Sequence, residues 1–216
     1  LQEVVDNAYN DYEPTRVARA IQDFTIGDLS NWYVRLNRKR FWKGEYNEDK
    51  KAAYHTLYTC LINLAHLASP IAPFYTDKLF NNLNEVSKEF DIESVHLSDF
   101  PETDNSMIDK ELEEKMDLAQ KISSMVHSMR KKHNLKVRQP LAKILIPDLD
   151  QDFKHHLQEV EALILSEVNT KKVEYLDHDS GVFVKKIKPN FRKLGKEYGP
   201  KMKEIAAAIS AFTTDD

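Results

Sequence analysis

Apolar side chains recur every three or four residues over the first two thirds of this chain, which is the spacing of helices with one buried face. The clearest stripe lies in residues 47–68, at Tyr54, Leu57, Tyr58, Leu61, Leu64, Ala65 and Ala68. The same spacing predicts further helices over residues 1–12, 17–29, 29–43, 74–86 and 106–133.

Start and stop signals between these stretches set the predicted boundaries. Pro14 ends the first helix, and the run from Ser69 to Pro73 ends the helix with the clearest stripe. Asp28 or Ser30 is expected to begin the helix over residues 29–43. The capping-box pattern from Ser106 to Asp109 is expected to begin the last of these helices.

After Asn134 the periodicity changes. Short apolar runs predict strands, and helical spacing returns between them, so that the elements in order are a strand at 143–146, a helix at 151–166, strands at 172–176 and 182–187, and a helix at 199–212. We therefore expect a mainly α fold, with an antiparallel helical bundle over residues 1–134 followed by a small α+β unit over residues 135–216.

The composition narrows the class of protein. The 216 residues are 41% hydrophobic and 31% charged, which is typical of a folded chain rather than a disordered one. The single cysteine, Cys60, excludes an internal disulfide framework and is expected to be a buried apolar thiol. No apolar run approaches the length of a membrane helix and no signal peptide opens the chain, so we expect a cytoplasmic protein.

Motifs that carry chemistry are missing from the sequence. It contains no glycine-rich phosphate loop, no cluster with metal-ligand spacing and no nucleophile elbow. The chain also begins at Leu1, without methionine and inside a predicted helix. We therefore expect a piece of a larger protein that has no catalytic residue, metal or cofactor of its own.

The net charge of −4 conceals a strong segregation of charge. Residues 81–117 hold twelve carboxylates against three lysines. Residues 118–147 hold seven Lys and Arg and no acid, and residues 185–203 hold eight Lys and Arg and one acid. Local positive fields of this kind attract polyanions even when the whole chain is acidic.

The most unusual stretch is SNWYVRLNRKRFWK, residues 30–43, in which five cations and four aromatic rings occur without a carboxylate. On a helix, Leu29, Trp32, Tyr33 and Leu36 share a core-facing side, and Arg35, Arg38, Lys39 and Trp42 share a neighbouring, displayed side. Arg40 projects near the apolar side, where it needs a carboxylate or carbonyl partner.

Two interpretations of this displayed side remain open. A solvated helix face is the common explanation of a charge run, but such faces usually mix signs because Glu–Lys pairs stabilise helices. Undiluted positive charge beside an exposed indole suits contacts with phosphates and stacking on an unpaired base. We favour nucleic-acid binding on this feature.

A second basic cluster, MRKKHNLKVRQPLAK, spans residues 129–143. Its first cations complement the negative end of a helix dipole, but Lys136 and Arg138 lie beyond the predicted helix end. Gln139 adds an amide that donates and accepts hydrogen bonds. A third cluster, over residues 185–203, includes Phe191 and fits either RNA binding or a solvated surface.

Several segments together resemble isoleucyl-tRNA synthetases. They are LSNWYVRLNRKRFW (29–42), AYHTLYTCLINLAHLASPIAPF (53–74), SVHLSDFP (94–101), KVRQPL (136–141), SEVNTKKVEYL (166–176) and KIKPNFRKLGKEYG (186–199). The similarity covers almost the whole chain in the right order. The matching part is the helical anticodon-binding domain and the start of the junction region, which follow the catalytic core in that family.

The resemblance implies a tRNA-recognition module of an enzyme that activates isoleucine with ATP and Mg and charges its tRNA. The catalytic signatures and the editing domain of the family are absent here, so ATP and Mg belong to the missing catalytic domain of the same chain. We expect a monomer that binds the anticodon stem-loop of an isoleucine-accepting tRNA. Two alternatives remain: the same module of a valyl or leucyl enzyme, and a helical scaffold for an acidic protein.

The candidate RNA-binding residues follow from the two basic clusters and from their positions in the family's basic-aromatic helix and RQP turn. They are Arg35, Arg38, Lys39, Arg40, Trp42, Lys43, Arg130, Lys131, Lys132, Lys136, Arg138 and Gln139. Trp32, Tyr33 and Phe41 are assigned to packing instead.

Overall fold

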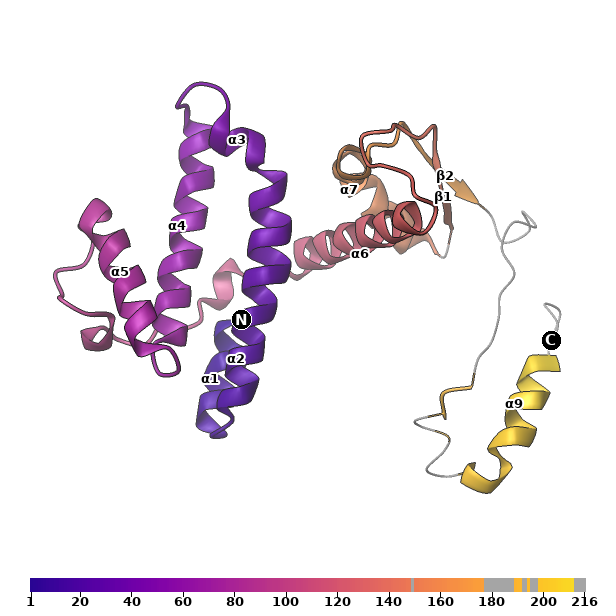
Figure 1. Cartoon of the computed structure of the whole chain (residues 1–216), viewed down its shortest axis with the longest axis horizontal. Coiled ribbons are helices and arrows are strands. Elements are labelled where there is room, and N and C mark those ends of the chain that lie inside the picture. The colour runs from indigo at the N-terminus through magenta and orange to yellow at the C-terminus, as the bar shows by residue number, and fades with distance from the viewer. Residues whose placement is uncertain (149, 177–188, 192–193, 195–197, 212–216) are drawn as a thin grey trace. The chain divides into compact units, whose positions relative to one another are not determined.

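A computed structural model describes residues 1–148, 150–176, 189–191, 194 and 198–211. The chain forms two compact units, Leu1–Lys110 and Glu111–Asp216. The fold is mainly α with a small two-stranded sheet, which confirms the predicted fold class (Figure 1). The strand predicted at 182–187 lies outside the described residues.

The first unit is helical throughout its regular structure. Its elements are α1 (Gln2–Asn10), α2 (Pro14–Asp23), the π-helix η1 (Phe24–Val34), α3 (Arg38–Trp42), α4 (Glu48–Ala68), α5 (Pro73–Ser87) and the 3-10 turns η2 (Val95–Leu97) and η3 (Asn105–Met107). The side chain of Asn47 caps α4 by accepting a hydrogen bond from the Lys50 amide, at 2.9 Å.

Helix α4 lies between the long α2–η1 helix and α5 (Figure 1). It contributes to both apolar clusters of the unit. One cluster joins α1, α2 and α4 through Val5, Ala8, Val17 and Leu67. The other joins α4, α5 and η2 through Ile62, Ala65, Phe80 and Val95.

The stripe predicted on α4 is only partly buried. Leu64 and Ala65 are buried, but Tyr54 is 42% exposed. Ile62 and Leu67, which are not in the predicted stripe, are buried instead. The difference arises because α4 packs on two sides, whereas a single-stripe pattern describes a helix with one buried face.

The predicted break near Asp28 and Ser30 is wrong. Helix α2 continues directly into η1, and Asp23 and Phe24 at their junction both have right-handed helical dihedrals. Gly27, Asp28 and Ser30 are all inside the π-helix. Tertiary packing, which buries Leu29 and Trp32 of η1, overrides these weak local break signals.

The predicted helix over residues 29–43 is instead interrupted at Asn37, whose φ of −87° and ψ of 8° are not helical. The Asn37 side chain donates to the Tyr33 carbonyl oxygen, at 2.8 Å, and accepts from Arg40 Nη1, at 2.6 Å. The Asn37 backbone amide also donates to the Tyr33 carbonyl oxygen, at 3.0 Å, so the side-chain bonds add to the backbone bond at the interruption. The short helix α3 follows the interruption.

The second unit contains most of α6 (Lys110–Lys132), then β1 (Ile144–Pro147), α7 (Gln151–Val168), β2 (Val173–Leu176), the 3-10 turn η5 (Gly199–Lys201) and α9 (Met202–Ala211). Strands β1 and β2 are parallel, and Ile144 is paired with Val173. Parallel pairing requires a crossover connection, which α7 supplies.

Helix α6 begins at Lys110, so the predicted start at Ser106 is wrong. Asp104 accepts hydrogen bonds from the amide and hydroxyl of Ser106, at 2.9 Å and 2.6 Å, and thereby caps η3. Ser106 is therefore part of a separate 3-10 turn, which ends at Met107, before α6 begins at Lys110.

Two side-chain contacts join α6 to α7. Lys115 contacts Glu159 of α7 as well as Glu111 of α6, and its bonds to these two carboxylates raise its pKa to about 12. His127 Nε2 lies 3.1 Å from Glu167 Oε1. These contacts connect α6 to α7 within the second unit. The division between a bundle and an α+β unit at residue 134 stays a prediction.

The side of α6 that is buried differs from the predicted stripe. Ala119, Ile122 and Val126 are buried as expected, but Leu112 is 53% and Met129 is 55% exposed. The polar residues Ser123 and Arg130 are buried in this helix.

Replacing Trp32 tests the core of the first unit. Trp32 is 8% exposed, so Trp32→Ala is expected to reduce the free energy of unfolding by about 3–5 kcal/mol. Trp42 is 69% exposed and supplies the matched control. Trp42→Ala should change the free energy of unfolding by less than about 0.5 kcal/mol. Urea denaturation followed by circular dichroism measures both, and equal losses would show that the burial of the two rings is misassigned.

Asp77 of α5 anchors the segment that carries η2. Its Oδ1 accepts hydrogen bonds from the Ser94 hydroxyl, at 2.6 Å, and from the Val95 amide, at 3.1 Å. The bond from Ser94, followed by the bond from Val95 and the charge of His96, holds the pKa of Asp77 below its ordinary value.

This lowered pKa predicts how stability depends on pH. The ionised carboxylate is favoured in the folded state, so its contribution is complete above the unfolded pKa of about 3.9 and is lost as the pH falls through the lower folded pKa. We expect Asp77→Asn to be less stable than the wild type at pH 7, and the difference to shrink at pH values below about 4. Thermal melts across this pH range, with Asp6→Asn as a charge control on exposed α1, measure the effect; a difference independent of pH would contradict it.

Candidate nucleic-acid interface

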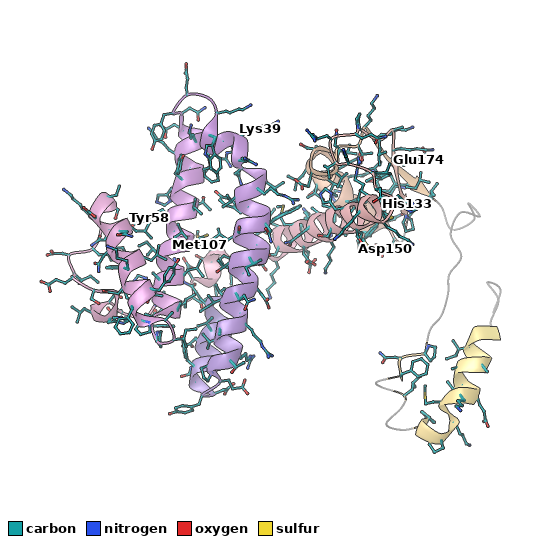
Figure 2. The ribbon with its side chains drawn as sticks, viewed as in Figure 1. Lys39, Tyr58, Met107, His133, Asp150 and Glu174 are labelled. Atoms are coloured by element: carbon teal, nitrogen blue, oxygen red, sulfur yellow. The ribbon has the colours of Figure 1, made fainter. Side chains whose placement is uncertain are left out.

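Four exposed residues of α3 and its C-terminal cap form what we call the α3 surface: Arg38, Lys39, Trp42 and Lys43. The Arg38 guanidinium lies over the Trp42 ring, 5.9 Å from its centroid. Lys39 lies at this end of the first unit (Figure 2). Within the described residues, none of the three cations forms an ion pair with a carboxylate. The α3 surface therefore presents positive charge beside an open aromatic face.

Trp42 is exposed because its neighbour Phe41 is used for packing. Phe41 is 6% exposed, and its ring lies 5.1 Å from that of Tyr54 and 6.3 Å from that of Tyr33. The Tyr54 hydroxyl also donates to the Phe41 carbonyl oxygen, at 3.1 Å. Phe41 thus attaches α3 to the unit, and the adjacent Trp42 projects away from it.

The assignment of rings to the core agrees with the structure. Trp32 and Phe41 are buried, and Tyr33 is half-buried with its hydroxyl donating to the Ala53 carbonyl oxygen, at 3.0 Å. Tyr33 and Phe41 both contact α4, through Ala53 and Tyr54 respectively.

Arg40 is half-buried, and its guanidinium is bound by neighbouring groups of the same unit. Its Nε and Nη2 donate to the two carboxylate oxygens of Asp49, at 2.8 Å and 2.7 Å, and Nη2 also donates to the Asp49 carbonyl oxygen, at 2.8 Å. Nη1 donates to Asn37. The sequence correctly indicated that Arg40 needs such partners. These bonds argue against its other predicted role, a direct contact with RNA.

Arg35 is exposed and precedes the interruption at Asn37, in the last turn of the long helix. It therefore does not lie on one regular helix with Arg38 and Lys39, as the helical projection assumed. Its role as an RNA contact stays a prediction.

One exposed ring near the α3 surface was missed by the sequence analysis. Tyr46 is 68% exposed in the connection between α3 and α4, and Lys51 Nζ lies 5.8 Å from its ring centroid. A tyrosine in a polar connection, close to Gly44 and followed by Lys50 and Lys51, is the signal that could have identified it.

The second candidate region is a turn formed by residues Lys136–Gln139, which we call the basic turn. All four residues are exposed, and the Gln139 amide closes the turn by donating to the Lys136 carbonyl oxygen, at 2.9 Å. Lys131 and Lys132, in the last turn of α6, are exposed as well. Lys136, Arg138 and Gln139, which were predicted to lie beyond the helix end, are thus exposed in one turn.

The chain turns sharply between α6 and the basic turn. Asn134 adopts a left-handed conformation with φ of 55°, and the Leu135 amide donates to the Arg130 carbonyl oxygen, at 2.8 Å. The Asn134 amide donates to the Lys131 carbonyl oxygen, at 3.2 Å. This pair of bonds is a Schellman motif, which explains why the helix stops here and the following cations leave its axis.

Arg130 is the clearest departure from the predicted site. It is 2% exposed, and its guanidinium donates to four backbone carbonyl oxygens. A side chain buried in this way has no surface to offer to a phosphate, so we withdraw Arg130 as an RNA contact.

The third basic cluster is only partly described. Phe191 is 60% exposed, and Lys201 and Lys203 are exposed, while the remaining cations between 185 and 196 lie outside the described residues.

His66 and Cys60 are packed among other residues of the first unit. His66 is buried, its Nδ1 lies 2.8 Å from the Ile62 carbonyl oxygen, and its ring contacts those of Phe80 and Phe90. Cys60 is half-buried, and burial raises the pKa of its thiol.

No helix in the described part of the chain has the length and apolar character needed to cross a bilayer.

Comparison with known proteins identifies the family to which this chain belongs. The profile of the anticodon-binding domain of tRNA ligase matches residues 1–146. An isoleucine–tRNA ligase from Cytophaga hutchinsonii is 63% identical over 212 residues, which are 98% of this chain and 19% of that protein. One from Bacteroides fragilis is 51% identical over 215 residues, 100% of this chain and 19% of that protein. One from Dehalococcoides mccartyi is 44% identical over 167 residues, 77% of this chain and 16% of that protein.

The chain thus spans roughly a fifth of the length of the first of these curated relatives. The profile match covers the whole helical unit, the α3 surface and the basic turn. This chain belongs to the anticodon-binding domain family of tRNA ligases.

Proposed function

We propose that this chain binds the anticodon stem-loop of an isoleucine-accepting tRNA, as the recognition part of an isoleucine–tRNA ligase. The observation that carries the proposal is the α3 surface, where exposed cations surround an open indole in a member of the anticodon-binding family. The names of the relatives supply the amino acid. In the parent enzyme, ATP and Mg would act in a catalytic domain outside this chain.

Different groups of the α3 surface would perform different parts of recognition. Arg38, Lys39 and Lys43 would contact phosphates, which provide affinity without reading sequence. Trp42 would stack on an unpaired loop base, since an exposed ring offers a surface that any base can cover. Tyr46 offers a second ring in the adjacent connection.

The basic turn would add contacts of both kinds. Lys136 and Arg138 carry exposed charges for phosphates, together with Lys131 and Lys132 at the end of α6. Gln139 carries an exposed amide that both donates and accepts, as reading a base edge requires.

Binding of the anticodon stem-loop, away from the catalytic domain, would still serve the charging reaction. Energy from a remote contact is used to orient the reacting end of a substrate, so tRNA recognition here would raise the rate in the missing domain. We infer that the parent acts as a cytoplasmic monomer, which tRNA charging permits. Sedimentation of the parent enzyme tests the monomer.

Salt dependence tests the phosphate contacts. We expect the affinity of the chain for an isoleucine tRNA transcript to fall steeply between 50 and 200 mM salt, as electrostatic binding does. Arg38→Ala should weaken binding and reduce the slope of log affinity against log salt by about 0.7–0.9, the value for one lost phosphate contact. Filter binding across a salt series measures both quantities.

Lys78→Ala is the matched control, because Lys78 is an exposed cation of α5 in the same unit. It should leave the slope unchanged. An affinity that does not respond to salt, or equal effects of the two variants, would contradict the proposed phosphate contacts. A transcript of the valine tRNA tests the amino-acid assignment, since equal or tighter binding would favour the valyl enzyme.

Stacking is tested at Trp42. Trp42→Ala should weaken tRNA binding roughly 5- to 150-fold, the range that corresponds to about 1–3 kcal/mol for one stacked base, and Trp42→Phe should recover part of the loss. Phe74, an exposed ring of α5, supplies the control variant Phe74→Ala. Quenching of tryptophan fluorescence on titration with tRNA, absent in Trp42→Phe, gives an independent readout, and unchanged affinity in Trp42→Ala would rule out the stacking role.

A further inference from the structure

Arg130 stands out in the second unit because a fully charged side chain is buried without a carboxylate partner among the described residues. Nη1 donates to the carbonyl oxygens of Lys136 and Gln139, both at 3.0 Å. Nη2 donates to those of Val168, at 2.8 Å, and Asn169, at 3.1 Å. The guanidinium therefore joins two segments of backbone that are far apart in the sequence.

One of these two segments is a helix end, which favours a nearby cation. Val168 and Asn169 lie at the C-terminal end of α7, where the last carbonyl groups lack helical partners and carry partial negative charge. Lys136 and Gln139 begin and end the basic turn. Arg130 satisfies the helix end and holds the turn against it with the same group.

Asn169 holds the basic turn a second time. It caps α7 in a left-handed conformation, with φ of 50°, and its Nδ2 donates to the Val137 carbonyl oxygen, at 2.8 Å. The Leu141 amide donates to the Asn169 carbonyl oxygen, at 3.1 Å. Three carbonyl groups of the basic turn, those of Lys136, Val137 and Gln139, are thus bound from the inner side.

Because Arg130 and Asn169 bind the backbone carbonyl groups of the basic turn, the side chains of the turn are left exposed to solvent. Lys136, Arg138 and Gln139 are all exposed, whereas the residue that holds them is 2% exposed. A planar fork with five donors can serve four carbonyl groups at once, which the single ammonium of lysine cannot do. The geometry requires arginine and not merely positive charge.

We propose that Arg130 and Asn169 are positioning residues for RNA recognition: they preset the backbone of the basic turn, so that Lys136, Arg138 and Gln139 are already directed outward when tRNA arrives. This inference rests on the proposed function. Preset groups lose less conformational freedom on binding, which increases affinity without any additional contact. Neither Arg130 nor Asn169 touches the RNA.

The test uses the 216-residue chain and separates the geometry of the Arg130 side chain from its positive charge. Arg130→Lys keeps the charge and loses the fork. Asn169→Gly loses the amide and keeps a residue that tolerates the left-handed conformation. Each is expected to weaken binding of the Cytophaga hutchinsonii isoleucine tRNA transcript about fivefold to tenfold, while circular dichroism shows the chain still folded at the assay temperature. Amide chemical shifts should change mainly in residues 136–141 and 168–171.

A second background separates positioning from general stability. In a chain carrying Lys136→Ala, Arg138→Ala and Gln139→Ala, the side chains to be positioned are gone. Arg130→Lys and Asn169→Gly should then cause less than about a twofold further loss of affinity, although they should still lower the melting temperature.

Each remaining result decides against the proposal. Unchanged affinity in both single variants, with reduced affinity in the triple-alanine chain, would overturn the positioning role and leave the proposed function intact. Equal losses in both backgrounds would mean that the two residues act through stability or direct contact. Unchanged affinity in the triple-alanine chain would remove the basic turn itself from the RNA site. If Arg130→Lys does not fold, the same comparisons with Asn169→Gly decide.

Discussion

Helix α4 is buried on two faces, and the arrangement of the first unit depends on this double burial. Leu67 on one side packs against α1 and α2, and Ile62 and Ala65 on the other pack against α5 and η2. Each fully buried aliphatic side chain stabilises the fold by about 1.5–3 kcal/mol, so both sides contribute substantially. Near the start of α4, Phe41 of α3 packs on Tyr54, and the cations of α3 lie outside this contact, except Arg40, which Asp49 binds.

Two arginines, one in each unit, are held by specific partners, and each joins two segments of its unit. Arg40 joins α3 to the start of α4 through Asp49, and Arg130 joins the basic turn to the end of α7. Each lies within a few residues of cations that stay exposed. In both regions, one guanidinium is used to hold the backbone that displays its neighbours. The candidate RNA surfaces are therefore built by buried or half-buried cations as well as by exposed ones.

Much of the fold could be predicted from local pattern. The spacing of apolar residues located α4, α5, α7 and both strands to within a few residues. The failures were at boundaries where local signals compete with packing. Asp28 and Ser30 suggested a new helix start, which the burial of Leu29 and Trp32 overrode. Ser106 resembled a helix cap, but Asp104 uses it to close a separate turn.

By itself, the amino-acid sequence determined which segments are helix or strand, which rings of residues 30–43 are in the core, and where positive charge is concentrated. These properties depend on neighbours three or four positions away, which a pattern contains. Only the tertiary structure decided which cations face outward. Arg130 is directed inward by the carbonyl oxygens of Val168 and Asn169, which are 38 and 39 residues away. Where those oxygens lie is a consequence of how α6 packs on α7, and no local spacing encodes it.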